Sequence, residues 1–230
     1  MTTFHVITLF PEVFDSIFSE SIIKRASGKK IIKIKFINPR DFATDKHKSV
    51  DDKPYGGGKG MVMRADILVK ALESIKSKPY KILLSASGKK YTQKTAQRLS
   101  SKSEIAIVCG HYEGIDARVE KYVDHVISIG DFVLTGGEIP AMTIMDSVTR
   151  LLPGAISEGS SENESFSQVY SPQFKVHSLL EYPQYTRPEE FRSQKVPAIL
   201  LSGNHKKIEE WREKEAEKRT AKFRPDLLKN

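Results

Sequence analysis

Short apolar segments alternate with segments of helical periodicity along the first two-thirds of this 230-residue chain. The strand-like segments are apolar or alternate apolar with polar residues, and they span residues 4–10, 31–37, 81–85, 104–109 and 125–129. Helix-like spacing occurs at residues 11–28, 65–75, 92–99, 115–122 and 140–152. Strands that alternate with helices favour a parallel sheet covered on both faces. The sequence therefore predicts an α/β fold with a mostly parallel sheet.

The composition changes at Ile156. The stretch ISEGSSENESFSQVYS is rich in Ser, Glu and Asn and has no apolar periodicity, which is typical of a linker. Beyond it the chain is mostly helical in pattern, and Asn204 is placed to cap a helix that runs through Ile208 and Trp211. We therefore expect an α/β domain over residues 1–155, a flexible linker over 156–171, and a small, mainly helical domain over 172–230.

The charge balance favours a polyanionic partner such as RNA. The chain has 37 Lys and Arg against 29 Asp and Glu, a formal net charge of +8. Residues 171–230 contain 13 of the basic and 9 of the acidic residues, a net charge of +4, so this part carries half of the excess. The basic excess alone is weak evidence, because many basic proteins bind no nucleic acid.

Cysteine usage and hydropathy predict a cytoplasmic protein. The single cysteine, Cys109, excludes an internal disulfide and a cysteine-based zinc cluster, and it fits a reducing compartment. The first residues, MTTFHVITLF, lack the basic segment and long apolar run of a signal peptide. No run of about 18 apolar residues occurs, so we expect no membrane-spanning helix.

Three glycine-bearing loops are the candidate ligand sites. They are YGGGKGM at 55–61, CGHYEGID at 109–116 and SIGDFVLTGGE at 128–138. The last two leave predicted strands and enter helices, where backbone donors bind polar ligands well. None has the spacing of a P-loop or a dinucleotide-binding GxGxxG turn, and no HExxH metal motif occurs.

These loops carry a resemblance to a known family. CGHYEGIDARV and SIGDFVLTGGEIPAM resemble the two cofactor loops of the bacterial tRNA (guanine-N1)-methyltransferases, which belong to the knotted SPOUT superfamily. The match extends over nearly the whole chain through LFPEVF, NPRDF, DDKPYGGGKGM, LLSASG, EYPQYTRPEEF, VPAILLSGNHKKIEEWR and RPDLL. Each string is short, but their order and spacing together are specific.

The resemblance implies a fold and a reaction. The α/β domain would contain a deep C-terminal trefoil knot, a feature absent from proteins apart from a few folds. The enzyme would transfer the methyl group of S-adenosylmethionine to N1 of the guanosine immediately 3′ of the anticodon in tRNA, supporting reading-frame maintenance. It would be a homodimer whose active sites are shared between chains. The family is also associated with Mg²⁺, for which this sequence offers no ligand set.

The resemblance also assigns cofactor contacts. Small residues and glycines there would let backbone groups reach the adenine edge. Carried over by motif, the cofactor-binding residues are Ala86, Ser87, Gly88, Gly110, Tyr112, Glu113, Ser128, Ile129, Gly130, Asp131, Phe132, Val133, Leu134, Gly136, Gly137 and Pro140. His111 stands where the family often has arginine, and Ala86-Ser87 replaces a common Pro-Gln.

Two residues are the implied catalytic groups. A guanine ring nitrogen carries a proton at neutral pH, so its methylation needs a general base. The family uses an aspartate in a D-S-F motif, and here Glu164 stands in that place, in Asn163-Glu164-Ser165-Phe166. Arg150 matches a family arginine thought to help activate the guanine, whose carbonyl oxygen gains negative charge. Without the resemblance, Glu164 would be interpreted as a solvated charge in the linker, and Arg150 as a cation that is favourably placed near a helix C-terminus.

Two other functions remain alternatives. The first is another knotted RNA methyltransferase, acting on a ribose hydroxyl or on rRNA, although the helical C-terminal domain and the NESF and YTRP strings argue against it. The second is a non-catalytic RNA-binding protein. Calorimetry with S-adenosylmethionine distinguishes this second alternative from a methyltransferase, because a protein that only binds RNA has no reason to bind this cofactor.

Overall fold

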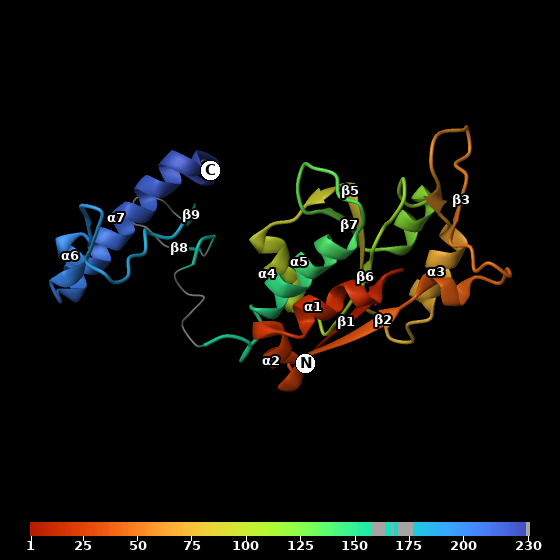
Figure 1. Cartoon of the computed structure of the whole chain (residues 1–230), viewed down its shortest axis with the longest axis horizontal. Helices are drawn as coiled ribbons and strands as arrows, with labels where there is room; N and C mark the ends of the chain where they lie inside the picture. Colours follow the sequence, from red (N-terminus) through yellow and green to blue (C-terminus); the bar gives the residue numbers. More distant parts are fainter. Residues whose placement is uncertain (158–163, 167, 170–176, 229–230) are drawn as a thin grey trace. The chain divides into compact units, whose positions relative to one another are not determined.

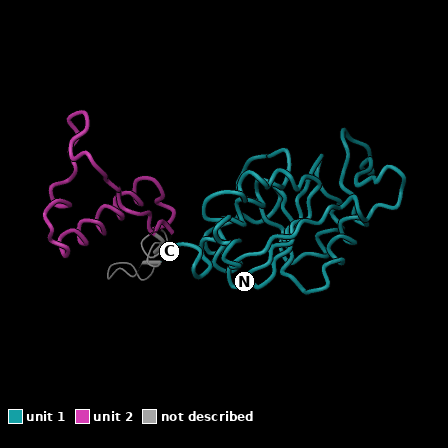
Figure 2. The backbone as a smooth tube through the Cα atoms, turned by 60° about the horizontal axis from the view of Figure 1, so that its bottom comes forward, with its two compact units in different colours: residues 1–157 teal, residues 158–230 magenta. Residues whose placement is uncertain are grey.

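The computed structural model describes residues 1–157, 164–166, 168–169 and 177–228. These form two compact units, residues 1–157 and 158–230 (unit 1 and unit 2), which Figure 2 colours teal and magenta. Each unit is treated by itself below. The expected linker at 156–171 falls largely outside the described residues.

A five-stranded parallel sheet forms the centre of unit 1 (Figure 1). Its strand order is β2-β1-β6-β5-β7, and every neighbouring pair runs parallel. The strands are β1 (Thr2–Ile7), β2 (Ile32–Ile37), β5 (Tyr80–Lys90), β6 (Glu104–Val108) and β7 (His125–Ser128). The α/β class and the parallel sheet are thereby confirmed.

Apolar side chains cover both faces of this sheet. Along β6, Ile105 and Ile107 face one hydrophobic cluster while Ala106 and Val108 face the other, as the two-residue repeat of a strand requires. The first cluster is completed by residues of α2 (Ser21–Gly28), α4 (Gln93–Ser100) and α5 (Glu138–Thr149). The second is completed by α3 (Ala65–Glu73) and the 3₁₀ helix η3 (Ala117–Tyr122). Burial on both faces explains why these strands read as near-continuous apolar runs.

The segment expected to form one helix over residues 11–28 is broken. It consists of η1 (Pro11–Phe14), α1 (Asp15–Phe18) and α2, with Ser21 at φ 53° where α2 begins. The apolar spacing is kept across the break, since Phe14 and Ile23 are both buried. Periodicity alone did not reveal the interruption.

The expected long loop at 39–60 contains short elements. These are η2 (Pro39–Phe42) and the strand β3 (Asp51–Asp52), which pairs antiparallel with β4 (Val62–Met63). β5 also runs past the predicted residue 85, because Leu84 and Lys89 both align with Ile127 of β7 and the residues between them bulge outward.

Unit 2 contains one long helix and several short elements. α7 (His205–Phe223) begins as predicted, because the Asn204 side-chain oxygen accepts a hydrogen bond from the Lys207 backbone N–H at 3.1 Å. The short elements are β8 (Gln168–Val169), β9 (His177–Ser178), β10 (Glu190–Phe191), β11 (Gln194–Lys195), α6 (Ala198–Leu201) and η4 (Pro225–Leu228). Within the described residues, no helix is long and apolar enough to cross a membrane.

Candidate active site

A pocket lies where the middle of β5 and the carboxyl ends of β6 and β7 meet the start of α5. β6 and β7 flank β5 in the sheet, so the loops that follow β6 and β7 lie on either side of the middle of β5. The pocket is lined by Leu83–Ala86 within β5, by Gly110–Ile115 after β6, and by Ile127–Gly130 and Phe132–Gly137 at and after the end of β7, together with Glu120 and Pro140.

Thirteen of the sixteen expected cofactor residues line this pocket. They are Ala86, Gly110, Tyr112, Glu113, Ser128, Ile129, Gly130, Phe132, Val133, Leu134, Gly136, Gly137 and Pro140. They come from three segments of the chain, at residue 86, residues 110–113 and residues 128–140, so the fold brings them together. The glycine loops at 109–116 and 128–138 thus form one site.

Three expected residues do not line the pocket. The Ser87 hydroxyl lies 2.9 Å from the Ser85 hydroxyl within the bulge of β5. Gly88 faces β7 instead, where an added Cβ would lie 2.6 Å from the Ile127 backbone nitrogen. Asp131 is exposed and forms an ion pair of 3.0 Å with Lys90. The motif placed these three residues near the pocket, but Ser87 and Asp131 make local polar contacts and the backbone of Gly88 packs closely on β7.

Close backbone approach explains the glycine at position 137. The Gly137 N–H donates to the Gly110 carbonyl at 2.8 Å, which joins the β6 and β7 loops at the pocket floor. A Cβ on Gly137 would lie 2.6 Å from the Cα of Cys109 and 2.7 Å from the nitrogen of Gly110. These atoms belong to the backbone and cannot move aside, so only glycine fits at this junction.

A buried polar group supports the pocket from behind. Glu138 opens α5 and is 6% exposed, and its Oε1 accepts a 2.7 Å hydrogen bond from the Thr8 hydroxyl. Its Oε2 lies 4.0 Å from Nδ1 of His111, too far for a hydrogen bond, and within the described residues that nitrogen has no other partner. Burial, with a contribution from Glu138, raises the pKa of the Cys109 thiol well above its usual value, so this cysteine stays neutral.

The pocket favours a cationic ligand. Glu113 and Glu120 are among the residues that line it, while in the described part of the chain His111 is the one lining residue able to carry positive charge. Tyr112 sits at φ 60° and its ring lies 5.4 Å from that of His111, which packs in turn 4.9 Å from Phe10. The lining therefore combines aromatic surface with negative charge.

Nine lining residues were missed from the sequence. Four of them lie within the recognised motifs: His111, Gly114, Ile115 and Thr135. Four others lie near the carboxyl ends of the predicted strands 81–85 and 125–129: Leu83, Leu84, Ser85 and Ile127. Their position in a motif or near a strand end could have identified all eight. Glu120 comes from η3 and carried no such signal, because a charged residue on a short helix is ordinarily solvated.

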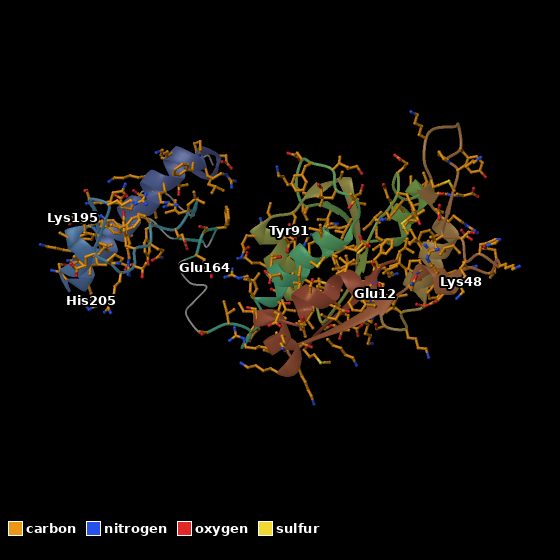
Figure 3. The ribbon with its side chains drawn as sticks, viewed as in Figure 1. Glu12, Lys48, Tyr91, Glu164, Lys195 and His205 are labelled. Carbon is orange, nitrogen blue, oxygen red and sulfur yellow. The ribbon has the colours of Figure 1, made fainter. Side chains whose placement is uncertain are left out.

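The two expected catalytic residues do not lie in this pocket. Arg150 caps the carboxyl end of α5, whereas Pro140 near its amino end lines the pocket. α5 has 12 residues, so at 1.5 Å per residue its two ends lie roughly 18 Å apart. Glu164 belongs to unit 2 (Figure 3).

The segment that carries Glu164 forms contacts with other residues of unit 2. The Phe166 N–H donates to the Leu179 carbonyl at 2.8 Å, and the Ser165 hydroxyl accepts from the Glu181 N–H at 3.1 Å. The Arg224 guanidinium lies 5.6 Å from the centre of the Phe166 ring. Ser165 and Phe166, the two residues that follow the base position, thus have defined partners in unit 2.

The residues that the structure describes include no group of three or more His, Cys, Asp or Glu able to hold a metal ion. The pocket instead offers backbone groups, two carboxylates and aromatic rings.

Comparison with known proteins identifies the family. The family model described as tRNA (Guanine-1)-methyltransferase TrmD matches residues 2–230. Relatives named tRNA (guanine-N(1)-)-methyltransferase include that of Carboxydothermus hydrogenoformans, 53% identical over 97% of this chain and 86% of the relative. The relative from Caldicellulosiruptor saccharolyticus is 54% identical over 98% and 89%, and that from Ruminiclostridium cellulolyticum 48% identical over 98% and 95%. This chain belongs to the tRNA (guanine-1)-methyltransferase family.

Proposed function

We propose that this chain methylates N1 of the guanosine immediately 3′ of the anticodon in tRNA and so supports maintenance of the reading frame. The observation that carries the proposal is the meeting of both family loops in one pocket at the carboxyl edge of the sheet. A methyltransferase of this family implies S-adenosylmethionine as the methyl donor. Ribose or rRNA methylation, or RNA binding without catalysis, would appear as other outcomes of the experiments below.

The pocket fits this cofactor in chemistry. S-adenosylmethionine is positively charged at its sulfonium and ammonium groups, which suits the carboxylates of Glu113 and Glu120. The glycines at 110, 130, 136 and 137 leave backbone groups accessible where a side chain would fill space. We infer that the thirteen residues that line the pocket hold the cofactor, whose sulfonium supplies an activated methyl group when bound.

The chain's own catalytic task is to prepare the guanine. Removing the N1 proton requires a base, and Glu164 supplies a carboxylate in the position of the family base. As the proton leaves, negative charge moves toward the guanine carbonyl oxygen, where the Arg150 guanidinium would stabilise it. Arg150 and Glu164 then act on the nucleophile, while the pocket orients the methyl group.

The active site is proposed to be shared within a homodimer. Arg150 is a helix length away from the pocket of its own chain, so a second copy would have to bring its Arg150 and Glu164 to it. Unit 1 also exposes apolar side chains on adjoining elements, since η1 packs against α5. These exposed residues are Phe10, Val13, Ile17 and Ile139. A second copy would cover them.

The finer features of the fold belong to the same proposal. We infer that the segments around the pocket thread as a trefoil knot and that unit 2 forms the helical tRNA-binding domain. The helix α7, the net charge of +4 over residues 171–230, and exposed basic residues such as Lys206 and Lys207 support a role for unit 2 on RNA.

Labelled S-adenosylmethionine, tRNA transcripts and nucleoside mapping test the reaction. Label in N1-methylguanosine next to the anticodon is expected, whereas label in a ribose or in rRNA alone would overturn the proposal. Subunit sharing is tested by mixing inactive Glu164→Ala and Gly130→Val chains. A heterodimer would contain one site with an intact pocket and an intact base, so activity should return. Verified heterodimers without activity would refute the shared site.

A further inference from the structure

The loop between β3 and β4 carries a tyrosine that no other part of the described chain covers. Tyr55 is 99% exposed, and four glycines with positive φ, Gly56, Gly57, Gly58 and Gly60, surround it on its C-terminal side. In Figure 1 this loop is the orange arm that extends away from the central sheet. A fully exposed aromatic side chain contributes nothing to the core, so we expect this ring to contact a partner.

The base of this loop is fixed to the wall of the cofactor pocket. The Glu113 N–H donates to the Met61 carbonyl at 3.0 Å, and the Met63 N–H donates to the Gly114 carbonyl at 2.9 Å. The Glu113 side chain fills the space beside Gly60 where a Cβ would stand. Because Glu113 and Gly114 line the pocket, the loop that holds Tyr55 is anchored at the reaction site.

Two lysines flank the tyrosine in the sequence, and the acidic residues Asp51 and Asp52 precede them. Lys53 and Lys59 lie on either side of Tyr55 in the sequence, and no ion pair within the described residues uses either of them. Arg118 lies close enough to interact electrostatically with Tyr55, although its main partner is Asp116 at 2.6 Å. An exposed aromatic ring between cations is the pattern of a surface that stacks on a nucleobase and contacts the adjoining phosphates.

We propose that Tyr55 stacks on a nucleobase of the tRNA beside the target guanine, with Lys53 and Lys59 contacting the flanking phosphates. This rests on the proposed function, because it assumes that tRNA reaches the pocket. Stacking tolerates any base, so Tyr55 adds affinity near the site without reading the sequence. The glycines let the loop adapt when the base arrives.

Direct tRNA binding, measured without turnover, is the first test. Tyr55→Ala should raise the Kd for tRNA by about 10- to 100-fold, the usual loss for one stacked base. Tyr55→Phe keeps the ring and should bind like the original chain. S-adenosylmethionine affinity should stay unchanged in both variants. The matched control is Tyr122→Ala, which removes a tyrosine that is 48% exposed beside the amino ends of β5 and β7.

A fluorescent reporter provides a second test. In a Trp211→Phe background, Tyr55→Trp places the one tryptophan at the proposed stacking position, and saturating tRNA should quench its emission. Unchanged affinity in Tyr55→Ala, or no quenching at position 55 in tRNA that is shown to be bound, would overturn the inference. Equal losses in Tyr55→Phe and Tyr55→Ala would also overturn it, because the hydroxyl would then matter more than the ring. If the original chain binds no tRNA, the proposed function itself fails.

Discussion

The Thr8 hydroxyl donates a 2.7 Å hydrogen bond to the carboxylate of Glu138, although the two residues are 130 positions apart in the chain. Thr8 follows β1 and Glu138 opens α5, so the bond joins the carboxyl end of β1 to the helix that borders the pocket. Both residues are buried. A buried carboxylate destabilises the folded state unless it is hydrogen-bonded, so we expect this bond to help maintain the shape of the pocket.

Thr8→Val should destabilise unit 1. The substitution keeps the shape of the side chain but leaves a buried carboxylate oxygen without its donor, which costs about 1–3 kcal/mol of unfolding free energy. Chemical denaturation measures it. Thr143→Val is the control, since that exposed hydroxyl only donates back to the Ile139 carbonyl of its own helix. Equal stability of the Thr8 variant and the original chain would contradict a structural role for the bond.

Gly137→Ala should abolish cofactor binding. The added methyl group would overlap the backbone at Cys109 and Gly110, so the β6 and β7 loops would have to separate at the pocket floor. Calorimetry with S-adenosylmethionine checks the loss. Gly28→Ala is the matched control, because nothing lies within 4 Å of the added Cβ there. A folded Gly137 variant that binds the cofactor normally would show that the close approach is dispensable.

The sequence predicted those structural features that depend on residues close together in the chain. The strand segments were found because burial on both faces demands apolar residues, as at Ile105 and Ala106. The cap at Asn204 was confirmed because an N-cap depends on residues three positions apart. The break at Ser21 and the bulge before Lys89 escaped prediction, and the bulge depends on the pairing of β5 with β7, which lies far along the chain.

The sequence did not reveal which residues from distant parts of the chain lie close together at the site. The family motif named Gly88, but its glycine is required by the backbone of β7 and not by the pocket. The motif likewise named Arg150 without showing that it stands at the other end of α5 from the pocket. Neither fact is encoded in neighbouring residues, because each depends on tertiary packing.

Alkaline pH should destabilise the fold through Tyr91, which follows β5 and lies in unit 1 (Figure 3). Burial raises the pKa of Tyr91 to about 12, opposed by its 2.7 Å hydrogen bond with the Ser147 hydroxyl. The unfolded chain has the lower pKa, about 10, and releases the proton first. The folded state is therefore favoured in full below about pH 10, and this contribution is lost as pH rises toward 12.

Tyr91→Phe tests this pH dependence. Between about pH 10 and 12, the unfolding free energy of the original chain should fall more steeply than that of the variant, which has no phenol to ionise at this position. Near neutral pH the variant should be less stable by about 1 kcal/mol, because the bond to Ser147 is lost. Parallel pH profiles for both proteins, measured by urea denaturation, would contradict the assignment.

Glu164→Gln is expected to slow methyl transfer by about 10²–10⁴-fold, the usual share of general acid–base catalysis. Glutamine keeps the size and polarity of the side chain but cannot accept the guanine proton. Cofactor affinity should remain nearly unchanged, because the pocket-lining residues belong to unit 1 and Glu164 to unit 2. Single-turnover rates at saturating cofactor and tRNA measure the effect.

Glu164→Asp separates a catalytic role from a structural one. Aspartate can take the same proton, and it is the family residue at this place, so the variant should retain much of the activity. If Glu164 only orders its segment, glutamine should do as well, because the neighbouring contacts of Ser165 and Phe166 fix that segment independently. A near-normal rate in the glutamine variant would mean that the base lies elsewhere. Glu113 would then be the next residue to test, since it is one of the residues that line the pocket.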